Sequence, residues 1–342
     1  MPRLLSFAHA LADDLITEVF SRPRLYPDGF GDLDALEALV DRVRAYCGPA
    51  AADEIDVEWT HDPVVDPRSG VVSRRGRFES PRADILADRG HLGTVELVMP
   101  GTDPDSRGPV CLLLAATGEE GFTLRRRFAA GLARIGIGSL LLENPFYGQR
   151  RPPGQWMSIL RTVRDQFAMN VATVDEGRSL LRWLHARGHQ RIGVTGYSQG
   201  GMMTAFCAAL TPFPVAAVPR AAGCSAVPIF TEMALGRRFA WDRLAEPFET
   251  IDAARDYFRR CLEPVDVRRF PAPIDTGLAV IVASRHDRFI PLAEADALAR
   301  HWPGARMQWV EAGHFTGALL FGRVQLEAVR TAFAGYDEDS RA

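Results

Sequence analysis

The chain has 342 residues, 47% of them apolar, which is enough for one large domain with a substantial core. All 40 basic residues are arginine, and the absence of lysine excludes P-loop nucleotide hydrolases and enzymes that hold a substrate or pyridoxal phosphate on a lysine Schiff base. Because the net charge is only -3, neither nucleic acid nor an anionic membrane is expected as the main partner.

The cysteines and the N-terminus bear on the cellular compartment. The 5 cysteines are dispersed and form no C-x-x-C pair, so neither a disulfide framework nor a metal site is expected, and a cytoplasmic location is the simplest prediction. Residues 1–18 have apolar positions at helical spacing, but Asp13, Asp14 and Glu18 interrupt them. Such acidic residues argue against a signal peptide or a transmembrane span. We expect this helix to pack on the core, with a membrane-surface helix as the alternative.

The first 66 residues are predicted to be a helical extension packed on the core, with helices over 4–20 and 32–46. Residues 67–342 are predicted to form the main domain. Two short β-like segments, 75–79 and 93–99, would form the antiparallel edge of its sheet.

From residue 110 onward apolar strands alternate with helices, which predicts an α/β fold with a mostly parallel sheet covered on both faces. Strands are predicted at 110–116, 137–142, 192–195, 215–218, 278–283 and 307–310. Helices are predicted at 124–135, 157–184, 202–210, 291–301 and 321–333. The basic cluster Arg125-Arg126-Arg127 is expected to be a solvated first helical turn.

Between residues 226 and 273 the alternation stops and large apolar residues gather. This segment is predicted to be a helical lid inserted into the main domain. The alternative is an ordinary helical excursion that does not touch substrate.

The motif Gly196-Tyr197-Ser198-Gln199-Gly200 lies where the strand at 192–195 turns into the helix at 202–210. A Gly-x-Ser-x-Gly sequence in that context is typical of a nucleophile elbow, in which the serine takes a strained backbone conformation. Side chains two positions before and after the serine would collide, and Gly196 and Gly200 remove that collision. Ser198 is therefore the predicted nucleophile.

A serine hydroxyl needs a histidine to take its proton and a carboxylate to orient that histidine. Sheets with a serine elbow present these residues in the order Ser, Asp or Glu, His. Asp287 and His314 follow the predicted strands at 278–283 and 307–310, so they are the predicted orienting acid and base. Taken alone, Asp287 could cap the next helix and His314 could be an ordinary loop histidine. His286 is the rival base.

Acyl transfer also needs backbone amides aimed at the developing oxyanion. The amide of Gln199, at the start of the elbow helix, is the first predicted donor. The second is predicted in the turn after the strand at 110–116, with Glu119 as first choice and Gly118 as second; a plain glycine turn is the alternative. Three aromatic residues are candidates for the substrate pocket: Tyr197, Phe230 and Trp241.

A helical pair of histidines, His185 and His189, has the i, i+4 spacing of a zinc helix. Ala186 stands where the metalloprotease glutamate would be, and Gly188 indicates that the helix is ending. A solvated helix end is therefore expected, with neither metal nor cofactor.

Three blocks of the chain resemble the α/β-hydrolase family that includes abhydrolase domain-containing protein eighteen. They are Ser139-Leu140-Leu141-Leu142-Glu143-Asn144-Pro145-Phe146-Tyr147-Gly148, the serine elbow, and the stretch from Ile290-Pro291 through Trp302-Pro303-Gly304 to Glu311-Ala312-Gly313-His314. The resemblance implies the α/β-hydrolase fold and a serine nucleophile with His and Asp partners, which fall on Ser198, His314 and Asp287. This chain departs from the family at two elbow residues. Tyr197, before the serine, is bulkier than the family's residue there, and Gln199, after it, is also carried by acyl-protein thioesterases and related carboxylesterases.

The leading hypothesis is a serine hydrolase that cleaves a carboxylic ester, a lipid or other apolar acyl ester being the favoured kind, through an acyl-enzyme and without a cofactor. Thioesterase and amidase activities are the alternatives within this class. A catalytically silent ligand-binding or interaction module is the alternative outside it. A homo-oligomer is compatible with the sequence.

Overall fold

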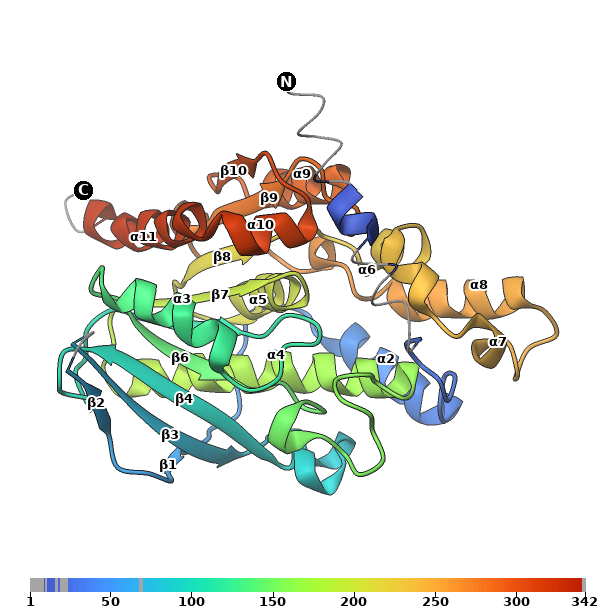
Figure 1. The fold of residues 1–342 in the computed structure, drawn as a ribbon, viewed down its shortest axis with the longest axis horizontal. Coiled ribbons are helices and arrows are strands. Elements are labelled where there is room, and N and C mark those ends of the chain that lie inside the picture. The colour runs from blue at the N-terminus through green and yellow to red at the C-terminus, as the bar shows by residue number, and fades with distance from the viewer. Residues whose placement is uncertain (1–8, 10, 16–17, 19–23, 68–69, 340–342) are drawn as a thin grey trace.

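The computed structural model describes residues 9, 11–15, 18, 24–67 and 70–339. Ten strands of this part of the chain form one sheet (Figure 1). In chain order they are β1 (Glu58–Trp59), β2 (Val64–Asp66), β3 (Val71–Glu79), β4 (Leu92–Pro100), β5 (Val110–Leu114), β6 (Gly138–Leu142), β7 (Ile192–Tyr197), β8 (Ala216–Arg220), β9 (Val280–Ser284) and β10 (Arg306–Val310).

The sheet has the order β1-β3-β4-β6-β5-β7-β8-β9-β10, and β2 pairs with β3. Six neighbouring strands run parallel, in the sheet order β6, β5, β7, β8, β9 and β10. Strand β4 is antiparallel to both of its neighbours, β3 and β6. This arrangement confirms the predicted mostly parallel sheet with an antiparallel edge. It also brings the carboxyl ends of β5, β7, β8, β9 and β10 to one edge of the sheet.

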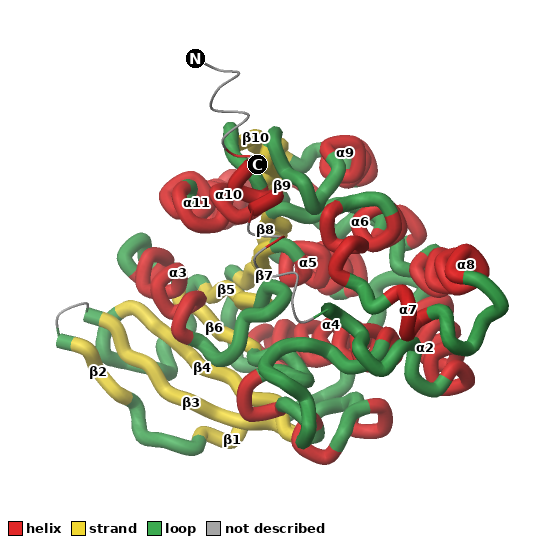
Figure 2. Tube along the Cα trace, turned by 45° about the vertical axis from the view of Figure 1, so that its right-hand side comes forward, coloured by secondary structure: helices red, strands yellow, loops and turns green. Residues whose placement is uncertain are grey.

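Helices cover both faces of the sheet (Figure 2). The described α-helices are α2 (Leu33–Ala45), α3 (Thr123–Ala133), α4 (Val163–Ala186), α5 (Gln199–Leu210), α6 (Ala226–Thr231), α7 (Trp241–Leu244), α8 (Ile251–Leu262), α9 (Leu292–His301), α10 (His314–Leu320) and α11 (Gly322–Asp339). Short 3-10 helices lie at Ala83–Ile85, Asp88–Gly90, Gly148–Arg150, Ala234–Arg238, Val267–Arg269 and Thr276–Leu278.

Strand alternation divides the core into two layers. In β5, Leu112 and Leu114 join the large cluster that includes α2, α4 and α5, whereas Cys111 and Leu113 join the cluster under α3 and α11. Both faces of β5 are therefore buried, which explains why its sequence is continuously apolar.

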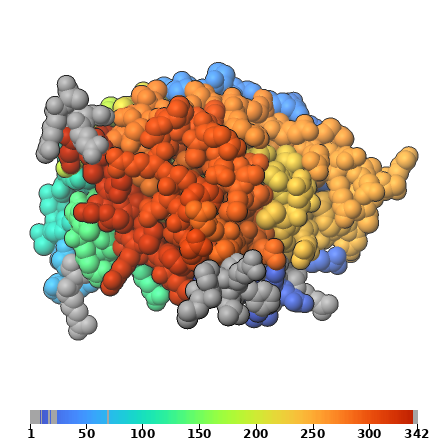
Figure 3. Space-filling view, turned by 90° about the horizontal axis from the view of Figure 1, so that it is seen from above, coloured from blue at the N-terminus to red at the C-terminus, as the bar shows by residue number. Residues whose placement is uncertain are grey.

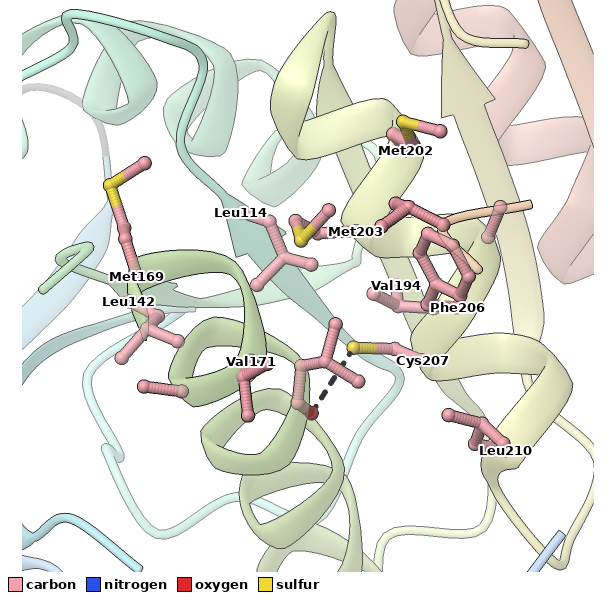
Figure 4. Close-up of a cluster of buried hydrophobic side chains, with 14 of the residues drawn as sticks. Leu114, Leu142, Met169, Val171, Val194, Met202, Met203, Phe206, Cys207 and Leu210 are labelled. Atoms are coloured by element: carbon pink, nitrogen blue, oxygen red, sulfur yellow. Dashed lines mark hydrogen bonds between the residues drawn. The ribbon is translucent and has the colours of Figure 1, made fainter. Parts of the chain in front are cut away.

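Helix α5, which follows the serine elbow, is almost entirely buried from Gly200 to Leu210. Figure 4 shows Met203, Phe206 and Cys207 of this helix packed against strand residues and against α4. A helix that is apolar on all sides is stable only in such a position. The elbow therefore rests on a helix that is buried in the core.

One predicted helix begins later in the structure than in the sequence-based prediction. The helix expected from residue 157 begins at Val163, because Thr162 is extended and its hydroxyl accepts a hydrogen bond from the amide of Asp165 (3.1 Å). Met157 has a positive φ of 46°, which no helix accommodates. His314 follows β10, as predicted, and is the first residue of α10.

The N-terminal segment is described in part. Residues 9, 11–15 and 18 are helical, and the remainder of the helix predicted over 4–20 lies outside the described residues. The described part, blue in Figure 1, lies beside the start of α10. Helix α2 confirms the helix predicted over 32–46.

The segment between β8 and β9 contains α6, α7 and α8 and makes up one end of the face shown in Figure 3, coloured yellow to orange. Its aromatic residues are packed together rather than exposed: the ring of Phe258 lies 5.7 Å from that of Phe239 and 6.0 Å from that of Phe230. We call residues 226–273 the insertion.

None of the described helices combines the length and apolarity that a membrane crossing requires. Among the same described residues, no cluster of three or more His, Cys, Asp or Glu side chains is arranged to hold a metal ion.

Candidate active site

Ser198 occupies the apex of a sharp turn between β7 and α5. Its φ of 56° and ψ of -118° lie in a sparsely populated region that costs on the order of 1–3 kcal/mol for a residue other than glycine. The turn is held by hydrogen bonds from the Ser198 amide to the carbonyl oxygen of Arg220 (2.9 Å) and from the Met202 amide to that of Ser198 (3.0 Å). The surrounding core therefore sustains the strain.

The two elbow glycines allow this turn by close backbone approach. A Cβ on Gly196 would collide with the backbone of Gly200. A Cβ on Gly200 would lie 2.6 Å from the carbonyl oxygen of Leu114. Both positions therefore exclude every side chain, as the sequence predicted for the elbow.

The structure brings Ser198, His314 and Asp287 into one hydrogen-bonded chain. The Oγ of Ser198 lies 2.9 Å from Nε2 of His314, and Nδ1 of His314 lies 2.8 Å from Oδ2 of Asp287. The other carboxylate oxygen, Oδ1, accepts hydrogen bonds from the amides of Phe289 (2.7 Å) and Ile290 (2.8 Å). With Nδ1 donating to Asp287, Nε2 is left as an acceptor for the serine hydroxyl.

Two opposing effects act on the His314 imidazole, which is buried. Burial lowers the pKa of His314, but the Asp287 carboxylate, and more weakly that of Asp13, raise it. The net result is a pKa above the ordinary histidine value. The positive charge that His314 would acquire on accepting a proton is therefore stabilised.

His286, the rival base, lies outside this chain. Its Nε2 is 3.1 Å from Oε2 of Glu311, an exposed carboxylate that also pairs with Arg285 (3.0 Å). This surface ion pair places neither His286 nor Glu311 in contact with Ser198.

In the turn after β5, the amides of both candidates for the second oxyanion donor are engaged in hydrogen bonds. The amide of Glu119 donates to the carbonyl oxygen of Ala116 (3.2 Å), so it is engaged within the turn. The amide of Gly118 donates to the hydroxyl of Tyr147 (3.3 Å). Within the described part of the chain, the amides of Thr117 and Gln199 have no acceptor, and both residues line the pocket beside Ser198.

Thr117 was not among the sequence-based candidates, because the glycine next to it drew the prediction to Gly118 and Glu119, in the middle of the turn. The Oγ1 of Thr117 donates to Oε1 of Gln199 (3.0 Å), which ties the turn after β5 to the first residue of the elbow helix. Only the folded structure brings these two residues together.

Arg125 is buried rather than solvated, which corrects the interpretation of the basic cluster. Its guanidinium donates to the carbonyl oxygens of Leu113 (2.8 Å), Leu142 (2.6 Å) and Gly121 (3.0 Å) and pairs with Glu119 (2.8 Å). The side chain thereby braces the turn that carries Thr117. The planar guanidinium, with five donors, can satisfy several carbonyls at once.

The block from Ser139 to Gly148 folds over the same turn. The Glu143 carboxylate accepts hydrogen bonds from the amide of Gly121 (3.1 Å) and from the hydroxyl of Thr94 (2.8 Å). Together with the hydrogen bond from Gly118 to Tyr147, this gives the block a physical role: it holds the turn after β5 in place.

A pocket opens beside Ser198 and encloses about 880 Å³ between atoms, including its open mouth. The insertion provides much of the apolar wall through seven residues: Ala226, Ile229, Phe230, Leu235, Phe258, Leu262 and Val265. The elbow helix adds Met202 and Met203.

Of the three aromatic pocket candidates, only Phe230 lines this pocket. Tyr197 is directed elsewhere: its hydroxyl donates to the carbonyl oxygen of His314 (2.6 Å). Trp241 packs behind the pocket wall, with its ring 6.3 Å from that of Phe258. Neither position follows from the sequence, because an aromatic residue in an apolar segment can face the pocket or the layer behind it.

Another part of the pocket lining is polar, and we call it the polar wall. Tyr26, Gln166, Asn170, Gln199 and Thr117 form a continuous chain of side-chain hydrogen bonds of 2.7–3.2 Å along it. Gln166 and Asn170 are separated by one turn of α4, which places them on one side of that helix. Of these five residues, only Gln199 was a sequence-based candidate, as a backbone donor, and no local motif marks the other four.

The sheet order, the two helical layers and the serine turn after the central parallel strand define the α/β-hydrolase fold. Solved structures of that fold are similar to this chain. An acetyl xylan esterase from Paenibacillus sp. R4 has a TM-score of 0.51 at 15% identity and covers 87% of this chain and 97% of its own. A cold-adapted esterase from an Arctic intertidal metagenomic library has a TM-score of 0.50 at 14% identity, covering 79% and 99%.

An acylaminoacyl peptidase from Pyrococcus horikoshii is similar at a TM-score of 0.51 and 11% identity, covering 83% of this chain and 42% of its own. At these identities the likeness shows the fold. The sequence itself matches the family described as alpha/beta hydrolase domain containing 18 over residues 23–252 and 247–334, and the chain belongs to that family. The resemblance predicted from the three sequence blocks is thereby confirmed.

Proposed function

We propose that this protein is a serine hydrolase that cleaves a carboxylic ester through an acyl-enzyme, with Ser198 as nucleophile, His314 as base and Asp287 as orienting acid. The observation that carries the proposal is the hydrogen-bonded chain from Ser198 to His314 to Asp287, with the serine in a strained turn. A hydrolase is also what membership of the family supports.

In the proposed reaction, His314 takes the proton of Ser198 as Oγ attacks the acyl carbon, and Asp287 stabilises the imidazolium. The backbone amides of Gln199 and Thr117 donate to the oxyanion of the tetrahedral intermediate. The intermediate then collapses, and His314 returns the proton to the departing alcohol. Water repeats the sequence on the acyl-enzyme and releases the acid, so no cofactor is required.

The two walls of the pocket favour an ester with one apolar part. The wall formed by the insertion offers no hydrogen-bonding side chain among its seven residues, and each acyl methylene buried there contributes about 0.8 kcal/mol. The polar wall can accommodate hydrogen-bonding groups of the substrate. We therefore propose a lipid or other apolar acyl ester, with the insertion acting as the lid over the acyl chain.

A fluorophosphonate reaction followed by intact-protein mass spectrometry tests the proposal, because a base-activated serine beside oxyanion donors reacts readily with this reagent. The wild type should gain one adduct and Ser198→Ala none. A wild type without an adduct would favour the catalytically silent binding module instead. Equal labelling of Ser198→Ala would remove Ser198 from the mechanism.

Esters, thioesters and anilides with the same acyl chain then separate the alternatives within the class. The ester should have the highest kcat/KM. A clear preference for the thioester or the anilide would move the assignment to a thioesterase or an amidase.

A further inference from the structure

Asp13, a residue of the N-terminal segment, is buried against the proposed catalytic centre. Its side chain accepts hydrogen bonds from three backbone amides: that of His314 (2.6 Å), that of Phe315 (3.0 Å) and that of Arg288 (3.2 Å). The first two amides belong to the turn that begins α10, and the third follows Asp287 directly. One carboxylate thus joins the segment that carries His314 to the loop that carries Asp287.

The turn before His314 has a sequence that admits this carboxylate. A Cβ on Gly313 would lie 2.7 Å from Oδ2 of Asp13, a distance at which something must shift. Glycine at this position therefore leaves the space that the carboxylate fills. A second contact from the N-terminal segment reaches the same turn. Nδ1 of His9 lies 2.9 Å from Oγ1 of Thr316, and this hydroxyl oxygen accepts a hydrogen bond from the Gly313 amide (2.8 Å).

Full burial of a carboxylate is rare unless it is paired or hydrogen-bonded, because the ion loses its hydration. Burial raises the pKa of Asp13, and the hydrogen bonds from the three amides oppose that rise. A carboxylate can accept from all three amides, because Oδ2 accepts from His314 and Arg288 and Oδ1 accepts from Phe315, whereas an asparagine would turn its NH₂ group toward at least one of these donors. The carboxylate therefore suits this junction despite the cost of burying it.

We propose that Asp13 is a positioning residue for His314, so that the N-terminal segment completes the active site. The proposal rests on the proposed function, in which His314 is the base. Asp13 sets the imidazole between Ser198 and Asp287 by fixing the backbone of His314 and of the Asp287 loop together. Its charge also favours the imidazolium that forms during proton transfer.

The titratable groups in contact with His314 come from three elements. Asp287 contacts the ring from the loop after β9, Asp13 contacts the backbone from the N-terminal segment, and Tyr197 of β7 donates to the backbone carbonyl oxygen. Further out, Arg288 pairs with Asp14 at 3.5 Å. His9 stacks on His286, with the ring centroids 6.2 Å apart, and His286 pairs with Glu311. Of these groups, the carboxylates of Asp287 and Asp13 raise the pKa of His314.

The experiment compares the wild type with Asp13→Asn in the full chain, and uses Asp14→Asn as the matched control. For each protein, kcat, KM and the second-order rate of fluorophosphonate labelling are measured between pH 5 and pH 9, with folding checked by circular dichroism and thermal melting. These pH limits of about 5 and 9 bracket the ordinary histidine value.

Asp13→Asn should lower kcat and the labelling rate by up to about 100-fold, the loss that a small misplacement of a catalytic group can cause, while KM changes little. The acid limb of the pH profile should also move to lower pH, because removal of the negative charge lowers the pKa of His314. A residue with a purely structural role would reduce the amount of folded enzyme and leave the acid limb unchanged. Asp14→Asn should behave like the wild type.

Folded Asp13→Asn with wild-type rates and an unmoved acid limb would overturn the positioning role. Absence of labelling in the wild type would instead overturn the proposed function, so the two failures are distinguishable. If Asp13→Asn does not fold, Gly313→Ala provides the second variant: it retains every charge but its Cβ competes with the Asp13 carboxylate for space. Folded Gly313→Ala should have a reduced kcat. Wild-type turnover in Gly313→Ala, or unfolding of both variants, would assign Asp13 to folding alone.

Discussion

Replacement of Asp287 by Asn tests the proposed triad most directly, because the structure determines which way the asparagine must face. Oδ1 of Asp287 accepts two hydrogen bonds, from the amides of Phe289 and Ile290, and Oδ2 faces Nδ1 of His314. An asparagine oxygen that keeps both amide hydrogen bonds presents its NH₂ group to His314. Nδ1 must then accept, the proton moves to Nε2, and the ring can no longer take the serine proton.

The size of the effect follows from the two available orientations. The wrong histidine tautomer lowers kcat by about 10⁴-fold in comparable triads, which is about 5.4 kcal/mol. Rotating the amide restores the tautomer but points NH₂ at two buried amide donors, at about 2 kcal/mol for each unsatisfied group. That total of about 4 kcal/mol corresponds to about 10³-fold, so kcat should fall by about 10³- to 10⁴-fold.

The assay is the turnover of a nitrophenyl ester by Asp287→Asn, with thermal melting to establish that the fold persists. Glu311→Gln is the matched control, because Glu311 also lies against a histidine ring, but on the surface. It should retain wild-type turnover, since exposed pairs of this kind contribute little. Near-normal turnover in folded Asp287→Asn, together with a large loss in Glu311→Gln, would reverse the assignment of the acid.

Two further predictions follow from the His314 environment and from the pocket wall. The base is active only when neutral, so kcat/KM should fall as pH decreases through the pKa of His314. The midpoint should lie above about 6.5, because the effect of the Asp287 and Asp13 carboxylates on this pKa outweighs that of burial. Initial rates measured against pH check this, and a midpoint below that value would contradict it. For nitrophenyl esters, kcat/KM should rise from acetate toward medium chains, because each buried methylene lowers the activation free energy by up to about 0.8 kcal/mol. Phe230→Ala should flatten this rise. Trp241→Ala, behind the wall, is the control; a profile that peaks at acetate and ignores Phe230→Ala would exclude an apolar acyl pocket there.

Parts of the fold and site that depend on neighbouring residues could be predicted from the sequence. The elbow is partly such a case, because a Cβ on Gly196 would meet the backbone of Gly200, four residues along, whereas a Cβ on Gly200 would meet Leu114 of β5. The strands of the parallel sheet were also recognisable, since burial on both faces requires continuous apolar runs such as that of β5. Asp287 and His314 could be chosen because parallel strands end at one edge of the sheet.

Other features were decided by packing between distant segments. Arg125 was interpreted as solvated, yet three carbonyl oxygens from two strands and a turn converge on its guanidinium. In the turn after β5, sequence favoured Glu119, but its amide is engaged by Ala116, and the amides without acceptors are those of Thr117 and Gln199. Composition does not reveal whether a given amide or guanidinium has found a partner.

The sequence by itself determined the elbow serine, the order of the three proposed triad residues and the class of sheet, because local sterics and strand periodicity are properties of short stretches of chain. Only the tertiary structure decided that Asp13 meets His314 and that Tyr26 joins the polar wall of the pocket. Both come from the N-terminal part of the chain, and their role depends on where that part docks. Docking is the summed result of many weak contacts between surfaces that are remote in sequence, so no short motif records it.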